Sequence, residues 1–104
     1  MRKRRYEILL PLKHNDGRPV SGELFEQTRE DLIARFGGVT LNPQTILGFW
    51  VGEGVRYEND LLRLIVDADD FPENRRFFDS FKRTLLERFQ QVEIYIASYP
   101  VDIL

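Results

Sequence analysis

Residues 45–66 read TILGFWVGEGVRYENDLLRLIV, in which two apolar runs flank a turn-forming Gly-Glu-Gly at 52–54. A short glycine-rich gap between two such runs favours a tight turn joining antiparallel strands. The sequence therefore predicts a strand over 45–51 and a returning strand that contains the β-branched and leucine-rich run 61–66. We place a bulge or a wider connection at 57–60, inside the returning strand.

One helix is predicted on each side of this hairpin. Ser21 is a suitable N-cap for a helix over 22–36, in which apolar residues recur every three or four positions, and Gly37 is suited to end it. The second helix is expected over 72–90, since Pro72 fits a first helical turn, where its missing N–H is tolerated.

Two further strands are expected outside the helices, over 5–12 and 92–99. The element order is then β-α-β-β-α-β, which favours an α+β ferredoxin-like sandwich, a four-stranded antiparallel sheet with two helices on one face. Right-handed crossovers place the first and third strands at the centre of the sheet. We expect residues 1–104 to form a single domain, with a basic N-terminal arm at 1–4 and a short C-terminal tail at 101–104.

The composition excludes several function classes. The chain has no cysteine and one histidine, which excludes disulfide frameworks, thiolate zinc sites, cysteine nucleophiles and multi-histidine metal centres. The net charge of −2 argues against a polyanion as the main partner. No apolar run approaches the roughly 18 residues of a membrane span, and the apolar run at 8–12 is too short for a signal peptide. We therefore expect a cytoplasmic protein without a membrane segment, and no cofactor is predicted.

Alternation along the predicted strands leaves one sheet face uncovered by helices. This face mixes apolar and aromatic residues with charges of both signs. The candidate interface or ligand-binding residues are Leu9, Trp50, Tyr57, Arg63, Ile65, Tyr95 and Tyr99. Our main interpretation is a homodimer that buries this face, because symmetric homodimers are the commonest oligomers and interfaces are enriched in aromatic residues.

Two other interpretations of the uncovered face remain open. A small-molecule pocket would be lined by Trp50, Tyr57, Tyr95 and Tyr99, with Arg63 or Arg18 holding an anion. Single-stranded RNA could stack on aromatic side chains of a sheet with this topology. Nucleic acid is the weakest candidate partner, since acidic residues share the face and no basic-glycine-aromatic run is present.

Two polar clusters have a possible chemical role and a simpler explanation. His14, Asp16 and Arg18 resemble a catalytic loop in which a carboxylate orients a histidine, but their turn-forming context favours a surface turn. The second cluster is acidic and consists of Asp67, Asp69 and Asp70. These carboxylates could attract a hard cation, but acids directly before a helix are explained by N-capping. The sequence thus favours a binding or assembly module over an enzyme, and it predicts no catalytic residue.

Four short motifs are spread over most of the chain: NDGRPVS at 15–21, RFGGVT at 35–40, GFW at 48–50 and GVRYE at 54–58. Together they resemble small bacterial proteins grouped only as domains of unknown function. The resemblance implies a compact ferredoxin-like domain and assigns no activity. It draws attention to Arg56 and Glu58, which would share one side of a strand, where a structural salt bridge is the simplest explanation.

Overall fold

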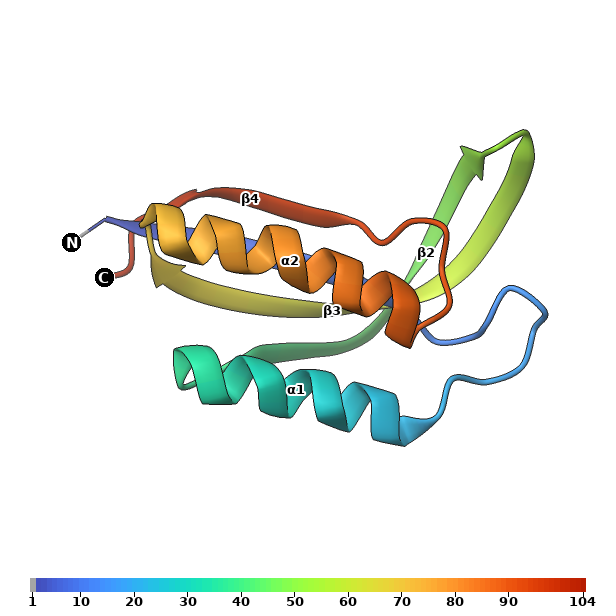
Figure 1. The fold of residues 1–104 in the computed structure, drawn as a ribbon, viewed down its shortest axis with the longest axis horizontal. Helices are drawn as coiled ribbons and strands as arrows, with labels where there is room; N and C mark the ends of the chain where they lie inside the picture. The colour runs from blue at the N-terminus through green and yellow to red at the C-terminus, as the bar shows by residue number, and fades with distance from the viewer. Residues whose placement is uncertain (1) are drawn as a thin grey trace.

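The computed structural model describes residues 2–104, with the side chains of 43–45 excepted. Its elements are β1 (Lys3–Pro11), α1 (Gly22–Phe36), β2 (Thr40–Gly52), β3 (Val55–Asp69), α2 (Pro72–Arg88) and β4 (Ile96–Val101). Both helices cover the same face of the sheet (Figure 1). The predicted element order and the ferredoxin-like α+β architecture are therefore confirmed.

The strands form one four-stranded sheet in the order β2-β3-β1-β4, and all neighbours are antiparallel. This order confirms the prediction that the first and third strands lie at the centre. In the register of β1 with β3, Leu9 lies opposite Arg63, and Glu7 lies opposite Ile65. Neither helix among the described residues is long and apolar enough to cross a membrane.

The hydrophobic core fills the space between the helices and the sheet. Alternate residues of β1 and β3 point into it, as the strand period requires. Tyr6 of β1 stacks on Phe78 of α2, with 3.9 Å between ring centroids. The largest side chains that are completely buried are Phe89, Ile8, Leu10, Leu32, Leu85, Ile94, Val66 and Thr28.

The predicted ends of α1 are confirmed by their capping groups. The Ser21 hydroxyl accepts a hydrogen bond from the backbone N–H of Glu23 at 3.3 Å. Gly37 adopts φ +80°, a left-handed conformation that favours glycine, and its N–H donates to the Ile33 carbonyl at 2.8 Å. α2 ends at Arg88, two residues before the predicted end.

The acidic cluster and the basic N-terminus are in contact with each other, which corrects two predictions. β1 begins at Lys3 and not at residue 5, so Lys3 and Arg4 belong to the sheet and not to a basic arm. The carboxylates do not cap α2, whose N-cap residue is Phe71, without a side-chain hydrogen bond. The ion pairs are Lys3–Asp69 at 2.6 Å, Arg4–Asp70 at 3.1 Å and Arg5–Asp67 at 2.8 Å.

Two strand boundaries and one bulge also differ from the predictions. The last strand runs from Ile96 to Val101, so Val101 is part of the sheet and 92–95 precede it. β3 pairs without interruption through 57–60, so the bulge predicted there is wrong. The register instead shifts in β2, between Asn42 and Ile46.

The hairpin of β2 and β3 extends past the end of both helices, and we call residues 46–61 the hairpin arm (Figure 1). Its pairing runs from Ile46 opposite Leu61 to Gly52 opposite Val55. The chain exposes 6694 Å², whereas a compact protein of its mass exposes about 6100 Å². Its radius of gyration of 14.0 Å also exceeds the roughly 13 Å expected for a compact domain of this length. The arm is thus an extension that the core does not cover.

Candidate interaction surface

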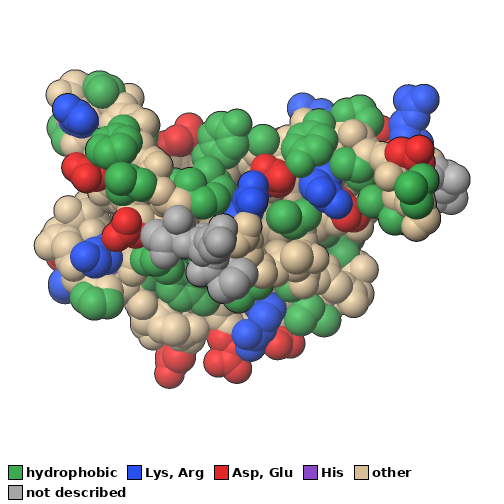
Figure 2. Space-filling model, turned by 180° about the vertical axis from the view of Figure 1, so that it is seen from behind, with side chains coloured by type: hydrophobic (Ala, Val, Ile, Leu, Met, Phe, Trp, Pro, Cys, Tyr) green, Lys and Arg blue, Asp and Glu red, His purple; other side chains and the backbone are tan. Residues whose placement is uncertain are grey.

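Most of the predicted site residues lie on the sheet face turned away from the helices. We define this open face by Glu7, Leu9, Arg63, Ile65, Asp67, Tyr95 and Tyr99. Figure 2, which views the molecule from this side, shows hydrophobic side chains interspersed with acidic and basic ones. Tyr95 is 60% exposed and Tyr99 is 40% exposed. Exposed apolar and aromatic side chains that are contiguous on one face are typical of an interaction surface.

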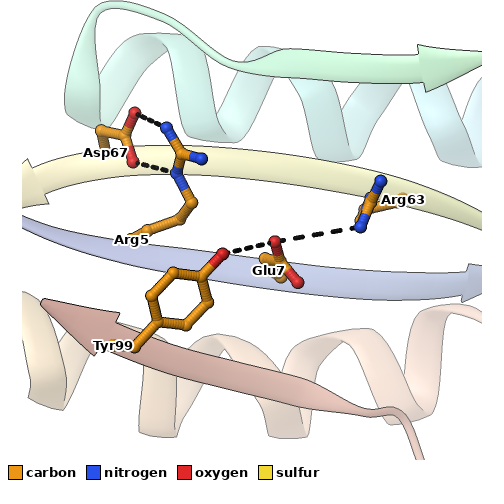
Figure 3. Close-up of polar contacts among 5 residues, drawn as sticks. All are labelled: Arg5, Glu7, Arg63, Asp67 and Tyr99. Carbon is orange, nitrogen blue, oxygen red and sulfur yellow. Dashed lines mark hydrogen bonds and ion pairs between the residues drawn. The ribbon is translucent and has the colours of Figure 1, made fainter. Parts of the chain in front are cut away.

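A network of polar contacts connects the charged residues of the open face (Figure 3). Arg5 donates two hydrogen bonds to the two carboxylate oxygens of Asp67, at 2.8 and 3.0 Å, and this contact raises the pKa of Arg5. The Tyr99 hydroxyl donates to Glu7 at 2.8 Å, which raises the pKa of Tyr99 because the carboxylate favours the protonated phenol. Arg63 lies 4.0 Å from the same Glu7 oxygen. The charges on this face therefore compensate one another.

The hairpin arm carries a second group of exposed apolar residues. Because side chains alternate along a strand, one side of the arm continues the open face, and the other continues the face that the helices cover elsewhere. On the latter side the helices are missing, and the exposed fraction is 53% for Leu47, 53% for Phe49 and 70% for Val51. The Arg56 guanidinium lies over the Phe49 ring, 5.6 Å from its centroid. Among the described residues Arg56 forms no ion pair with Glu58, so the expected salt bridge is absent.

Trp50 and Tyr57 are directly opposite in the arm and stack with 4.4 Å between ring centroids, on the side that continues the open face. Two glycines make room for this packing. A Cβ on Gly52 would lie 2.5 Å from the Trp50 ring, and a Cβ on Gly48 would lie 2.8 Å from a Leu61 methyl carbon. Gly52 therefore leaves room for the Trp50 ring, whereas the close approach at Gly48 involves only the end of a flexible leucine side chain.

A hollow of about 230 Å³ lies where the arm leaves the sheet. It brings together the predicted residues Leu9, Trp50 and Tyr95, whereas Tyr57 stacks on Trp50 outside it. Its full lining is Leu9, Pro11, Gly48, Phe49, Trp50, Asn59, Leu61, Gln91, Glu93, Ile94 and Tyr95. Arg63, Ile65 and Tyr99 lie on the open face but not in this lining. The sequence analysis did not assign Asn59, Leu61 and Glu93 to a site. The glycines at 48 and 52, on either side of Trp50, were the available signal that side chains pack closely against the backbone here.

The loop between β1 and α1 is a turn stabilised by its own polar groups. The backbone N–H and the side chain of Arg18 both donate to the Asp16 carboxylate, which lowers the pKa of Asp16. The His14 backbone N–H donates to the Arg18 carbonyl at 2.8 Å. Asp16 makes no hydrogen bond to the His14 ring among the described contacts, so the geometry required to orient a catalytic histidine is not formed.

The described residues do not contain a group of three or more histidine, cysteine or acidic side chains placed to hold a metal ion. Asp67, Asp69 and Asp70 contact basic side chains of β1 and are not directed at a common point. The same three ion pairs occupy the cationic side chains of Lys3, Arg4 and Arg5. Their contacts reduce the positive charge available to a phosphate backbone.

Comparison with known proteins identifies similar folds. No protein-family model matches the sequence, and a search of curated proteins finds no match. The CutA1 divalent cation tolerance protein of Thermus thermophilus is 16% identical, with a TM-score of 0.63 over 97% of this chain and 85% of that one. CutA1 from Oryza sativa is 12% identical, with a TM-score of 0.64 over 99% of this chain and 83% of the other.

A phage SAM lyase, solved in complex with S-methyl-5'-thioadenosine, is also similar. It is 13% identical, with a TM-score of 0.67 over 97% of this chain and 90% of that one. At such low identity these likenesses establish the shared fold and nothing about activity. CutA1 and the SAM lyase share one fold under different names, which illustrates this separation of fold from function.

Proposed function

We propose that this protein is a self-associating binding module that forms a homodimer through its open face and its hairpin arm. The observation that carries the proposal is the arm. A two-stranded hairpin is only marginally stable in water unless something packs against it. Here the arm extends past the core and exposes Leu47, Phe49 and Val51, so a second copy would supply the missing layer.

The open face supports the same proposal. It contributes Leu9, Ile65 and Tyr95 on the side of the sheet opposite to Leu47, Phe49 and Val51, so the second copy would have to wrap around the arm to contact both groups. The charges of the open face are already compensated within the chain. A stable interface buries about 800 Å² on each partner, roughly an eighth of the 6694 Å² that this chain exposes. Two of the motifs that resemble uncharacterised bacterial domains, at 48–50 and 54–58, lie on the arm, and we propose that those proteins use the same surface.

Solution mass tests the proposal directly. We expect size exclusion with light scattering to give twice 12.3 kDa for the wild-type protein. Tyr95→Glu and Phe49→Glu should shift the mass toward the monomer, because each introduces a charge into an apolar interface. Circular dichroism should show unchanged helix content, since neither residue belongs to the buried core.

Phe71→Glu is the matched control. Phe71 is also apolar and 45% exposed, but it lies at the start of α2, at the opposite end of the sheet from the arm. This variant should keep the wild-type mass. A wild-type protein that is monomeric at every concentration tested would overturn the proposal, and so would a Phe71→Glu variant that dissociates as readily as the other two.

A further inference from the structure

The hollow at the base of the hairpin arm has the features of a small-molecule site. Residues far apart in the sequence converge there: Leu9 from β1, Trp50 from β2, Leu61 from β3 and Tyr95 from the segment before β4. Their side chains make its walls apolar and aromatic, as in most ligand pockets. At about 230 Å³ the hollow is somewhat smaller than a drug-sized pocket and suits a single ring system.

The polar groups around the hollow restrict the charge of its ligand. Glu93, Gln91 and Asn59 contribute a carboxylate and two carboxamides. Lys82 binds one Glu93 carboxylate oxygen at 2.8 Å, which lowers the pKa of Glu93 and keeps it ionised. The same oxygen also accepts from the Ile94 N–H at 2.9 Å.

The second oxygen of Glu93 has no contact among the described residues and is available as an acceptor. Of the side chains that the structure describes in the lining, none is a lysine, arginine or histidine. Arg63, which the sequence suggested as an anion-binding group, lies beside Glu7 instead. An anionic ligand would thus meet the Glu93 carboxylate, and the nearby Lys82 ammonium is already paired with that carboxylate. A neutral ligand with an N–H donor would instead meet an acceptor.

We propose that this hollow binds a neutral, flat aromatic compound that carries an N–H donor. Its ring would pack between the aromatic side chains Trp50 and Tyr95, and its N–H would donate to Glu93. The hollow is complete within a single chain, but it shares Leu9 and Tyr95 with the surface that the proposed dimer would bury, so a ligand and a second copy would compete for it.

Three matched probes test the ring and the charge separately. Benzamide is flat and neutral, benzoate has the same ring with a negative charge, and cyclohexanecarboxamide has the same amide without the flat ring. Trp50 is the only tryptophan and reports directly on the hollow. We expect benzamide to change Trp50 fluorescence in a saturable way in the millimolar range, as its size allows, and to bind at least several-fold more tightly than either other probe.

Two variants connect the binding to named side chains. Tyr95→Ala should weaken benzamide binding severalfold, whereas Tyr99→Ala, which removes another exposed tyrosine of the open face, should leave it unchanged. Glu93→Gln should reduce the preference of benzamide over benzoate. Absence of saturable binding by benzamide, or equal binding of benzamide and benzoate, would overturn the inference.

Measuring the affinity for benzamide at several protein concentrations distinguishes a ligand site from a dimer interface. If benzamide binds with the same affinity below and above the concentration at which the mass changes, the hollow is a ligand site that the dimer does not cover. If its apparent affinity falls as the dimer forms, the second copy competes with benzamide for the hollow, as the shared residues Leu9 and Tyr95 require. If the mass measurement shows only a monomer, the dimer proposal fails, but the benzamide titration can still be interpreted.

Discussion

At the scale of single residues, Arg88 of α2 makes two short hydrogen bonds to side chains of α1. Its side chain is only 11% exposed; it donates to the buried Thr28 hydroxyl at 2.9 Å and to Asp31 at 2.8 Å. Replacing it by methionine keeps most of its volume and removes both charge-assisted hydrogen bonds. Arg88→Met should therefore lower the free energy of unfolding by about 2 kcal/mol, measured by urea denaturation.

The control for Arg88 is another arginine of α2. Arg76 lies 3.5 Å from Glu73, and both side chains are about two-thirds exposed. Because surface pairs of this kind contribute little, Arg76→Met should change the free energy of unfolding by less than about 0.5 kcal/mol. Equal effects of the two variants would show that the contact between α1 and α2 does not depend on Arg88.

Local sequence was sufficient for some residues and insufficient for others. Ser21 and Gly37 were assigned correctly because a cap depends on the residue itself and on its nearest neighbours. Asp67, by contrast, was taken as part of a helix-capping cluster, since its partner Arg5 lies 62 residues away in the sequence. Only the pairing of β1 with β3 brings the two together. The sequence placed Leu9, Trp50 and Tyr95 on one face of the sheet, but only the fold brings Asn59 and Leu61 of the arm to the same hollow.

At the scale of elements, the hairpin was predicted from its turn, but its projection was not. The glycine-rich turn and the alternation of apolar and polar residues are local signals. The arm extends beyond the core because neither helix reaches past its base (Figure 1). The bulge was predicted in β3, but the register shifts in β2, between Asn42 and Ile46. A pattern in one strand does not show which of two partners takes up an extra residue.

The packing of the arm predicts different effects for two glycine substitutions. Gly52→Ala should push the Trp50 ring off Tyr57, since the new Cβ would lie 2.5 Å from that ring. We expect a red shift of tryptophan emission, as the indole becomes more exposed to water, and a loss of about 1 kcal/mol in unfolding free energy. In Gly38→Ala the new Cβ would have no atom within 4 Å, so neither the tryptophan emission nor the unfolding free energy should change noticeably. An unchanged Trp50 spectrum in Gly52→Ala would contradict this account of the arm.

At the scale of the whole molecule, α2 is attached to the sheet by contacts that respond to opposite ends of the pH range. The Lys82 ammonium and the Ile94 N–H lower the pKa of Glu93, which lies between α2 and β4. Burial raises the pKa of Tyr6, which stacks on Phe78 of α2. The lowered pKa makes ionised Glu93 stabilising above its ordinary pKa, and the raised pKa makes protonated Tyr6 stabilising below its own.

The free energy of unfolding should therefore fall on both sides of neutral pH. As pH drops below about 4.5 and passes the lowered pKa of folded Glu93, the stabilisation by the Glu93 carboxylate is lost. As pH rises above about 10 and passes the raised pKa of folded Tyr6, the stabilisation by the Tyr6 phenol is lost. Urea denaturation from about pH 3 to about pH 11 should show Glu93→Gln with a shallower acid limb and an unchanged alkaline limb. Tyr6→Phe, which keeps the stacked ring, should show the reverse. If either variant flattened both limbs, stability would depend on overall charge and not on these two contacts of α2.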